Sequence, residues 1–352
     1  MRFAIGMAAA LVLFASELRI ERVFGPEVPT GPYKHPANID VLRNGDLYLV
    51  YYGGAGEYAV DTGVFGSRLR KGETKWSQPK RIAHDPFRSV GNAVVWQAPD
   101  GLVWLFYVVR YGDTWSTSRI QGKVSRDDGE TWSDSFMVSG TEGMMVRNKP
   151  IVLSGGEYLL PVYHEVGDDT EMVGAGSTSR FLRFDPKSKT KEWIELGAIR
   201  SKKGNIQPGV VELRDGHLIA YCRRGGGYGP VSDGYAVYAE SRDGGKTWTE
   251  GVDSQFQNPN SALELLKLRS GNLLLIFNDS MYQRTPLTAA LSTDGGKTWP
   301  YRKNIGAEPK QSYAYPAAAQ DAEGKVHLVY TSNNRSEIYH AVFDENWVRE
   351  KQ

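Results

Sequence analysis

Cysteine is almost absent from this chain of 352 residues, and neither sign of charge predominates. The single cysteine, Cys222, excludes an intrachain disulfide bond and a metal cluster built on cysteine ligands. Lys and Arg number 42 and Asp and Glu number 41, so the formal net charge is +1. A general nucleic-acid-binding surface needs a basic excess, which this balance does not provide. The sequence therefore predicts no nucleic-acid partner.

Long apolar runs are also absent, with one exception at the start of the chain. Residues 1–16, MRFAIGMAAALVLFAS, place one Arg before an apolar run from Phe3 to Ala15. That run has the length of the apolar part of a signal peptide and is short for a bilayer span. We therefore expect a signal peptide over residues 1–16, a single domain over 17–352, and a secreted or periplasmic protein without a membrane span. A buried first strand or a short membrane anchor is the alternative.

Glycine and aromatic residues are abundant, and they recur in a repeated pattern. Six segments run apolar, turn at a glycine and run apolar again. Turns such as Asn44-Gly45 and Asp100-Gly101 use dipeptides that tolerate the positive φ of tight hairpins. Six hairpins at intervals of about 50 to 60 residues predict radial repetition of one unit. The segments are residues 35–53, 92–110, 149–165, 207–224, 261–279 and 315–332.

A second repeated element keeps the same interval. The segments SRDDGETW (125–132), SRDGGKTW (241–248) and STDGGKTW (292–299) share the spacing S-x-D-x-G-x-T-W. We expect the Asp to accept backbone N–H groups within a turn, and the Trp to pack that turn against its own sheet. Looser copies end at Trp76, Trp193 and Trp347.

These octapeptides are similar to the Asp-box, or BNR repeat, and the chain resembles the sialidase-like β-propellers over about residues 30–348. The resemblance implies an all-β fold with six blades. It also implies that the Asp-boxes lie on the outer edge and take no part in chemistry. Because propellers carry many unrelated functions, the activity has to be argued from the site.

In a propeller the inner strands surround a central channel, so the ends of the six hairpins are where a pocket is expected. These ends carry a mostly cationic set of residues in a chain with almost no net charge. The pattern predicts an anion-binding pocket, with structural ion pairs between blades as the alternative. The set comprises Lys34, His35, Asn92, Arg110, Arg147, Lys149, His164, Glu165, Gln207, Arg223, Arg224, Asn278, Asp279, Arg284 and Tyr315. Our candidates for substrate binding are Lys34, Arg110, Arg147, Lys149, His164, Arg223 and Arg284.

The resemblance also implies roles for individual residues. Sialidases hold the substrate carboxylate with three arginines, and they use a Tyr nucleophile with a Glu partner and an Asp acid/base. The segment QPGVVELRDGHLIAYCR matches the second arginine at Arg223, and RTPLTAALSTDGGKTW matches the third at Arg284. Tyr315 matches the nucleophile, with Tyr313 as the alternative, and Asp61 matches the acid/base.

Two positions depart from that pattern. Where sialidases carry Arg-Ile-Pro at the first arginine, this chain has Lys34-His35-Pro36, and Gln207 stands where the Glu partner is expected. A Lys offers one point charge where an Arg offers a planar fork. A Gln cannot take the proton of a phenol whose pKa is near ~10. Candidates for another base are Glu165, His164 and His35.

Several residues also have structural explanations. Asp61 fits a turn cap, and Tyr315 fits packing between blades, since the chain holds 19 tyrosines. The run Gly225–Gly227 follows a strand but opens no helix, so we expect a loop at the pocket rim rather than a dinucleotide site. His35 and His164 lack a third ligand at metal spacing. The sequence therefore implies no metal and no organic cofactor.

The leading hypothesis is an exported, exo-acting glycoside hydrolase of the sialidase-like class that releases a terminal carboxylated sugar from a glycan. In it, Asp61 protonates the leaving oxygen, Tyr315 stabilises or attacks the reacting carbon, and Glu165 is the base. If Gln207 instead indicates a uronate or neutral substrate, a mechanism with two carboxylates is open. The rivals are a polysaccharide lyase or a glycosidase acting on glycans that contain uronate or rhamnose, and a non-catalytic glycan-binding propeller. The sequence predicts neither the sugar nor the oligomeric state.

Overall fold

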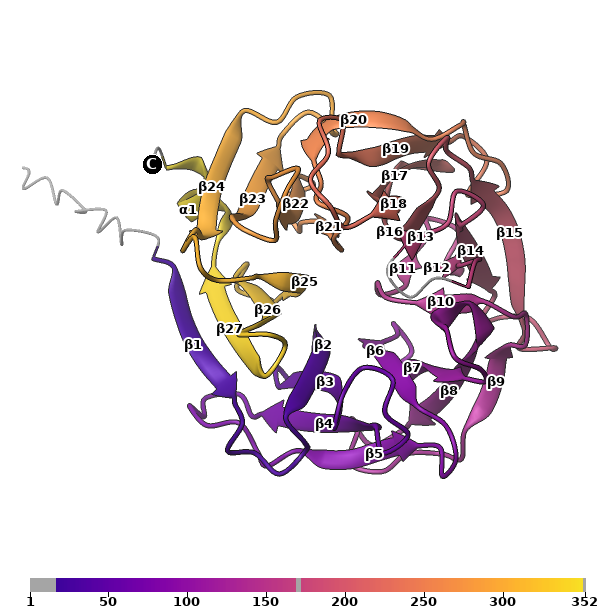
Figure 1. Cartoon of the computed structure of the whole chain (residues 1–352), viewed down its shortest axis with the longest axis vertical. Coiled ribbons are helices and arrows are strands. Elements are labelled where there is room, and N and C mark those ends of the chain that lie inside the picture. Colours follow the sequence, from indigo (N-terminus) through magenta and orange to yellow (C-terminus); the bar gives the residue numbers. More distant parts are fainter. Residues whose placement is uncertain (1–16, 169–171, 351–352) are drawn as a thin grey trace, which may run out of the picture.

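The repeated hairpins form the inner strands of six sheets arranged around a central axis (Figure 1). The structure is a computed structural model that describes residues 17–168 and 172–350. The predicted signal peptide, residues 1–16, lies outside the described residues. Five blades contain four antiparallel strands each, and the third contains five. The prediction of an all-β, six-bladed propeller is confirmed.

The blades follow one another along the chain. The first consists of β2 (Tyr33–Val41), β3 (Leu47–Gly54), β4 (Gly63–Leu69) and β5 (Lys80–His84), and the second of β6 (Val90–Gln97), β7 (Val103–Arg110), β8 (Ser118–Ser125) and β9 (Phe136–Ser139). The third consists of β10 (Met144–Val146), β11 (Ile151–Val152), β12 (Tyr158–His164), β14 (Thr178–Phe184) and β15 (Trp193–Ile199). The fourth consists of β16 (Asn205–Arg214), β17 (His217–Arg224), β19 (Tyr235–Ser241) and β20 (Val252–Gln257).

The fifth blade consists of β21 (Glu264–Lys267), β22 (Leu273–Asn278), β23 (Leu287–Ser292) and β24 (Tyr301–Gly306). The sixth consists of β25 (Ala314–Gln320), β26 (Val326–Ser332), β27 (Glu337–Phe343) and, at its outer edge, β1 (Arg19–Phe24). Outside the blades are a small sheet of β13 (Met172–Val173) and β18 (Gly226–Gly227), the 3-10 turn η1 (Trp115–Thr117) and the helix α1 (Glu345–Arg349). In the described part of the chain, no helix is long and apolar enough to cross a membrane.

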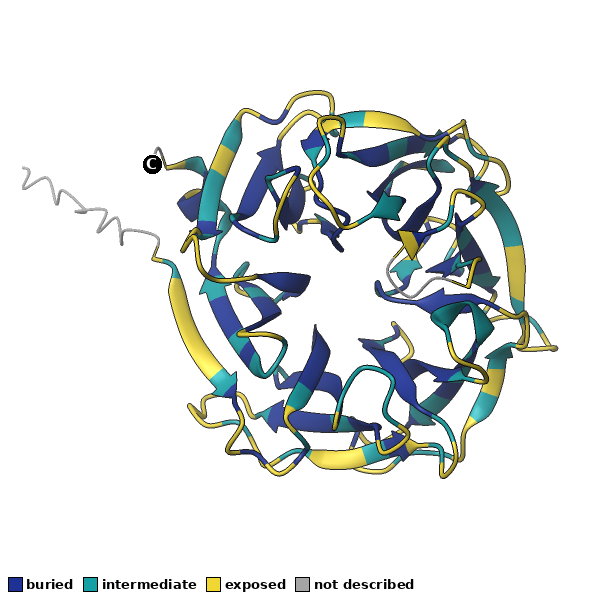
Figure 2. Cartoon of the chain, in the orientation of Figure 1, coloured by how far each residue is buried: buried dark blue, intermediate teal, exposed yellow. Residues whose placement is uncertain are grey.

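Burial follows distance from the axis (Figure 2). Inner and middle strands such as β3 and β7 are buried almost throughout, whereas outer strands such as β20 carry exposed residues. Between neighbouring blades, apolar side chains of both sheets pack face to face and form the seams that hold the ring together.

The Asp-box turns join the third and fourth strands of their blades. In the second blade, both carboxylate oxygens of Asp127 accept hydrogen bonds from Thr131, from the backbone N–H at 2.9 Å and the hydroxyl at 2.5 Å. These bonds, with another from Ser125, lower the pKa of Asp127 to about 2. The same contacts recur at Asp243 and Asp294, which shows that these residues stabilise turns.

The tryptophans of these turns correct one expectation. Trp248, in the fourth blade, stacks on Phe181 of the third blade at 4.4 Å between ring centroids. Trp299, in the fifth blade, packs edge-on against Tyr221 and Phe256 of the fourth. The rings therefore fill the seam with the preceding blade rather than packing only against their own sheet.

The first strand closes the ring because it pairs with the last hairpin. β1 runs antiparallel to β27, and its last residue, Phe24, is 4% exposed and lies 5.8 Å from the Tyr51 ring of the first blade. Phe24→Ala should therefore destabilise the fold by about 3–5 kcal/mol. Ile20, on the same strand but 40% exposed, is the matched control, and Ile20→Ala should change stability by less than about 1 kcal/mol. Urea unfolding measures both, and equal losses would show that β1 does not close the seam.

Candidate active site

Bulges in the inner strands aim side chains into the centre of the ring. The register of β6, β16 and β25 shifts where each strand reaches the channel, and the residue at each shift has positive φ. These residues are Asn92 (φ 46°), Gln207 (φ 54°) and Tyr315 (φ 54°). This conformation is strained for residues other than glycine, and such strain is concentrated at functional sites. The repeated bulge therefore indicates a functional site at the centre of the ring.

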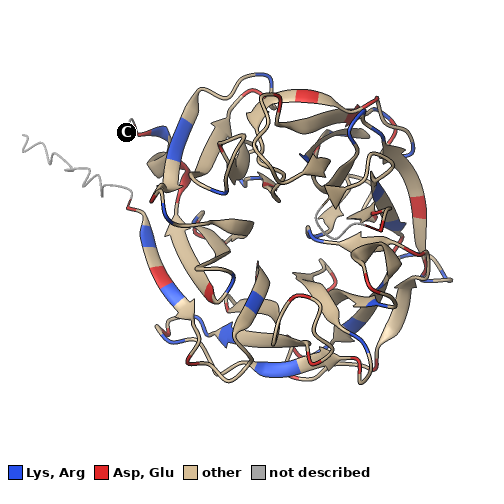
Figure 3. Ribbon diagram, viewed as in Figure 1, with Lys and Arg blue, Asp and Glu red and all other residues tan. Residues whose placement is uncertain are grey.

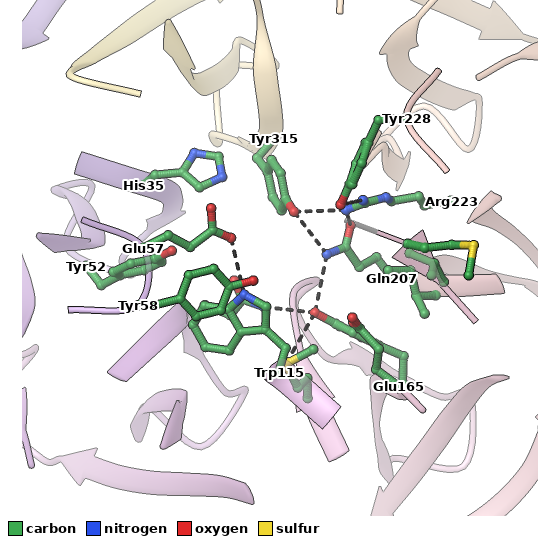
Figure 4. Close-up of a pocket in the computed structure, with 16 residues that line it drawn as sticks. His35, Tyr52, Glu57, Tyr58, Trp115, Glu165, Gln207, Arg223, Tyr228 and Tyr315 are labelled. Atoms are coloured by element: carbon green, nitrogen blue, oxygen red, sulfur yellow. Dashed lines mark hydrogen bonds between the residues drawn. The ribbon is translucent and has the colours of Figure 1, made fainter. Parts of the chain in front are cut away.

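Tyr315 is the hub of a hydrogen-bonded group that spans three blades (Figure 4). Its hydroxyl accepts a hydrogen bond from Arg223 Nη1 at 2.9 Å and a longer one from Gln207 Nε2 at 3.5 Å. Gln207 Nε2 also donates to the Tyr163 hydroxyl at 3.3 Å, and its Oε1 accepts from Arg223 at 3.2 Å. Gln207, where a Glu was expected, therefore acts as a donor toward the Tyr315 oxygen.

Three arginines surround the Tyr315 ring, of which Arg147 and Arg223 are buried and Arg284 is half-buried. The guanidinium carbons of Arg147, Arg223 and Arg284 lie 5.3, 5.9 and 5.4 Å from its centroid. Among the described residues, no carboxylate oxygen comes within 4.0 Å of a guanidinium nitrogen of these three. By contrast, charges of both signs lie side by side on the outer strand β1 (Figure 3). Buried charges without counter-ions are costly. Arg147 donates a hydrogen bond from Nη2 to the Pro316 carbonyl at 2.7 Å, whereas Arg223 and Arg284 leave uncompensated positive charge beside Tyr315.

The arginines also change the acidity of the phenol. Burial raises the pKa of Tyr315, but the positive charges of Arg223, Arg284 and Arg335 outweigh it and lower the pKa below its ordinary value. Hydrogen bonds that donate to the oxygen favour the phenolate in the same way. The phenol of Tyr315 therefore gives up its proton more readily than an ordinary tyrosine.

Glu165, directly after β12, is a carboxylate that lines the centre of the ring. Burial raises its pKa to about 7, the charge of Glu57 adds to this, and Arg223 opposes it. A carboxyl group with a pKa near neutrality can exchange protons with a reacting group at physiological pH.

The open space at the centre has two adjoining parts. A narrow recess of about 30 Å³ is lined by residues that include His35, Glu165, Gln207, Arg223 and Tyr315. A wider basin of about 530 Å³ is lined by residues that include Arg284, Tyr315 and Arg335. The recess has room for about one water molecule, whereas the basin has room for a sugar ring. Tyr315 lies on the boundary, together with Glu57, Tyr58 and Tyr228.

His35 packs its ring edge-on against Tyr315 at 4.3 Å and bonds through Nδ1 to the Thr331 hydroxyl at 2.7 Å. Burial and the charges of Arg335 and Arg284 lower its pKa well below the ordinary value. His35 is therefore a neutral ring that supports Tyr315, and a neutral imidazole already bonded at Nδ1 is a weak base for the phenol.

The other predicted site residues lie outside the two cavities. Asp61 is exposed, and its carboxylate accepts hydrogen bonds from the Ala55 N–H at 3.1 and 3.2 Å, as in the turn-cap alternative. Lys34 is buried and donates to the Gly31 carbonyl at 2.5 Å, so its amine is satisfied away from the basin. Lys149 pairs with Asp40 at 3.1 Å, as expected for a structural ion pair between blades.

Arg110 and His164 are engaged in holding loops and strands. Arg110 donates to the Ser89 hydroxyl at 2.8 Å and to the carbonyls of Tyr58 and Asp113. His164 Nδ1 lies 3.5 Å from an Arg180 nitrogen. Catalysis by Asp61 and substrate binding by Lys34, Lys149, Arg110 and His164 therefore stay predictions that this geometry does not favour.

Four of the site residues that the sequence analysis missed share one kind of position. Glu57 lies four positions before Asp61, Tyr228 follows the glycine run, Trp115 belongs to η1, and Arg335 lies on the turn after β26. Their common feature is a place on loops outside the inner hairpins. Tyr228 could have been predicted, because it directly follows the glycine run that was expected to form the pocket rim. Its hydroxyl accepts a hydrogen bond from Arg223 Nη2 at 2.9 Å.

Within residues 17–168 and 172–350, no three His, Cys, Asp or Glu side chains gather so that they could hold a metal ion.

Comparisons with known proteins agree with this architecture. A sialidase from Bacteroides fragilis (strain YCH46) is 25% identical over 242 residues, which cover 64% of this chain and 42% of that protein. The chain thus spans less than half the length of that relative. The solved Hadza microbial sialidase Hz136 aligns with a TM-score of 0.75 at 17% identity, over 91% of this chain and 67% of that one.

The intramolecular trans-sialidase from Ruminococcus gnavus, solved with oseltamivir carboxylate, aligns with a TM-score of 0.75 at 14% identity, over 94% of this chain and 98% of that one. These structural likenesses concern the fold. At the level of sequence, residues 45–328 match the BNR repeat-like domain. The chain therefore belongs to the BNR repeat-like domain family, as the Asp-box spacing predicted, and folds as a sialidase-like six-bladed β-propeller.

Proposed function

We propose that the protein is a glycoside hydrolase of the sialidase-like class that releases a terminal carboxylated sugar from a glycan. The observation that carries this is the pair of buried Arg223 and half-buried Arg284, which lie beside Tyr315 without a carboxylate partner. A sugar carboxylate in the basin would supply the missing negative charge through charge-assisted hydrogen bonds. The Bacteroides fragilis relative and the Ruminococcus gnavus trans-sialidase, solved with a carboxylated ligand, support the proposal.

In this mechanism the substrate carboxylate lies against Arg223 and Arg284, which places the anomeric carbon above Tyr315. The phenol oxygen attacks or stabilises that carbon, as befits a centre whose own carboxylate repels an anionic carboxylate nucleophile. The phenol proton passes to Glu165 through a water molecule in the recess, since both residues line it. Gln207 donates to the developing phenolate instead of accepting its proton.

Two carboxylates, Asp61 and Glu57, are candidates for protonating the leaving oxygen. Asp61 has this role in the predicted mechanism, and its carboxylate would reach the basin only if the loop that follows β3 rearranged. Glu57 lies closer, but hydrogen bonds from Tyr33 and Trp115 and the ion pair with Arg335 occupy both of its oxygens. Parallel assays of Asp61→Asn and Glu57→Gln separate the two residues.

A second function, elimination at a uronate, is favoured by the lowered pKa of Tyr315. A phenolate can abstract the proton next to a carboxylate that arginines neutralise, and this would cleave the glycan as a lyase does. The product then contains a conjugated double bond, which absorbs ultraviolet light, whereas hydrolysis gives none.

The test is a screen of the purified protein against aryl α-sialosides, aryl β-glucuronides, aryl α-L-rhamnosides and a uronate polysaccharide. We expect aryl release from a carboxylated glycoside and none from the neutral rhamnoside. Unsaturated product from the polysaccharide would replace hydrolysis by elimination. If the protein binds glycans but turns over none of these substrates, the result would favour a non-catalytic glycan-binding propeller.

We also propose that the protein is exported, on the strength of the apolar run in residues 1–16. Amino-terminal sequencing of protein recovered from the periplasm or medium should show cleavage near Ala15 or Ser16. Full-length protein confined to the cytoplasm would contradict export.

A further inference from the structure

A strained turn presents one more arginine to the basin. Between β26 and β27, three successive residues have positive φ: Asn333 (49°), Asn334 (54°) and Arg335 (63°). Asparagine tolerates positive φ, because its short side chain can hydrogen-bond to the nearby backbone. Arginine has no such compensation, so the conformation is unfavourable for Arg335. Such strain persists where surrounding contacts impose it, and it is concentrated at sites that bind ligands.

Contacts from the first blade hold the turn in place. The Arg335 carbonyl accepts a hydrogen bond from the Lys34 N–H at 2.8 Å. Its Nη1 donates to the Tyr33 hydroxyl at 3.0 Å and forms an ion pair with Glu57. The other oxygen of Glu57 accepts from Trp115 Nε1 at 3.2 Å, so the carboxylate is itself fixed.

Arg335 faces the same space as the arginine cluster. It lines the basin together with Arg284 and Tyr315. Its charge reaches both of them, since it contributes to the lowered pKa of each. Among the described residues, the Nη1 contacts are the hydrogen bonds of its guanidinium, so Nε and Nη2 are available to a ligand.

Lys34 occupies the sequence position at which sialidases carry their first arginine, but its amine is bound to the Gly31 carbonyl. Lys34 therefore presents no charge to the basin. Arg335, in the sixth blade, presents a guanidinium there instead, from the turn after β26, which packs beside β2. The backbone bond between Lys34 and Arg335 makes the two positions direct neighbours.

We propose that Arg335 binds the carboxylate of the substrate as a third arginine beside Arg223 and Arg284, and that Glu57 is its positioning residue. The inference rests on the proposed function, because it names a further residue for the same anion. Glu57 also acts as an internal counter-ion. It holds Arg335 toward the basin and reduces the net positive charge that an incoming carboxylate meets.

The test compares acids with their esters, which separates a role in anion binding from a role in folding. Calorimetric titration measures the binding of N-acetylneuraminic acid and D-glucuronic acid, each beside its methyl ester. In Arg335→Met we expect the preferred acid to bind about 10- to 100-fold more weakly and its ester to be unchanged. Arg335→Lys should recover part of the loss, since it restores the charge without the fork.

Two further variants sharpen the comparison. Glu57→Gln keeps a hydrogen-bond acceptor for Arg335 but removes the negative charge, so the acid should bind about 3- to 10-fold more tightly. Arg349→Met removes another ion-paired arginine, in α1 and paired with Glu345, and should leave acid and ester binding unchanged. If Arg335→Met fails to fold in a thermal scan, Arg335→Lys and Glu57→Gln carry the test.

The outcomes distinguish this inference from the proposed function. If the unmodified protein binds an acid better than its ester and Arg335→Met does the same, only the role of Arg335 is overturned. Loss of acid binding in Lys34→Met but not in Arg335→Met would assign the third cation to Lys34. If the unmodified protein prefers neither acid to its ester, the inference and the carboxylated substrate fail together.

Discussion

Tyr315→Phe should lower kcat/KM on the carboxylated glycoside found by the screen by about 10²–10³-fold, the loss seen when a group that stabilises a charged transition state is removed. The phenylalanine ring keeps the packing against His35 and the three arginines but lacks the oxygen that Arg223 and Gln207 contact. Binding of the free sugar acid should change little, because the carboxylate is held by arginines. Steady-state kinetics and calorimetry of the same variant separate the two effects.

Tyr313→Phe is the matched control for this prediction. Tyr313 lies two residues earlier and is also buried. Its hydroxyl accepts a hydrogen bond from the Glu308 N–H at 3.2 Å, outside both cavities. We expect its kcat/KM to stay within about twofold of the unmodified protein. An equal loss in both variants, or none in Tyr315→Phe, would remove Tyr315 from the chemistry.

Glu165→Gln should lower kcat/KM by about 10²–10⁴-fold at neutral pH and change the shape of the pH profile. With a pKa of about 7, Glu165 accepts a proton only when ionised, so activity of the unmodified protein should fall as the pH drops below 7. In Glu165→Gln this acid limb near pH 7 should disappear. Rate measurements from pH 5 to about 9 follow the limb directly.

Glu264→Gln is the control for the pH effect, because burial also raises the pKa of Glu264 to about 7 and it lines neither cavity. A raised pKa means that the folded protein binds this proton more tightly than the unfolded chain. Its stabilising contribution is therefore complete below the ordinary pKa and is lost as the pH rises through 7. Glu264→Gln should reduce this pH dependence of stability and leave the acid limb of activity in place. If it removed the limb, Glu264 and not Glu165 would be the titrating group.

The fold could be predicted because its turns are specified by short sequence motifs whose contacts lie within the motif itself. Asn44-Gly45 and its counterparts define tight turns, and the Asp-box at Asp127 is satisfied within its own octapeptide. Such signals reveal the number of blades and their phase. They do not reveal where a large side chain packs, so the contact of Trp248 with Phe181 of the preceding blade required the structure.

The site was predictable to the extent that it is built on strands. Gln207, Arg223 and Tyr315 stand at the ends of inner strands, and the closed ring brings such ends together. Residues on loops were not predictable in this way. Glu57 and Asp61 share one loop, and contacts distant in the sequence, from Trp115 and Arg335, decide that Glu57 reaches the cavities.

The pairing of β1 with β27 has a consequence for how the molecule is made. During synthesis β1 is made before β27, so β1 has no partner strand until the last hairpin has left the ribosome. Tyr315 belongs to that final blade and Arg335 to a turn within it, so the proposed anion site forms only when the ring closes. In a truncated chain that lacks the final blade, the arginines have no common centre at which to meet a ligand.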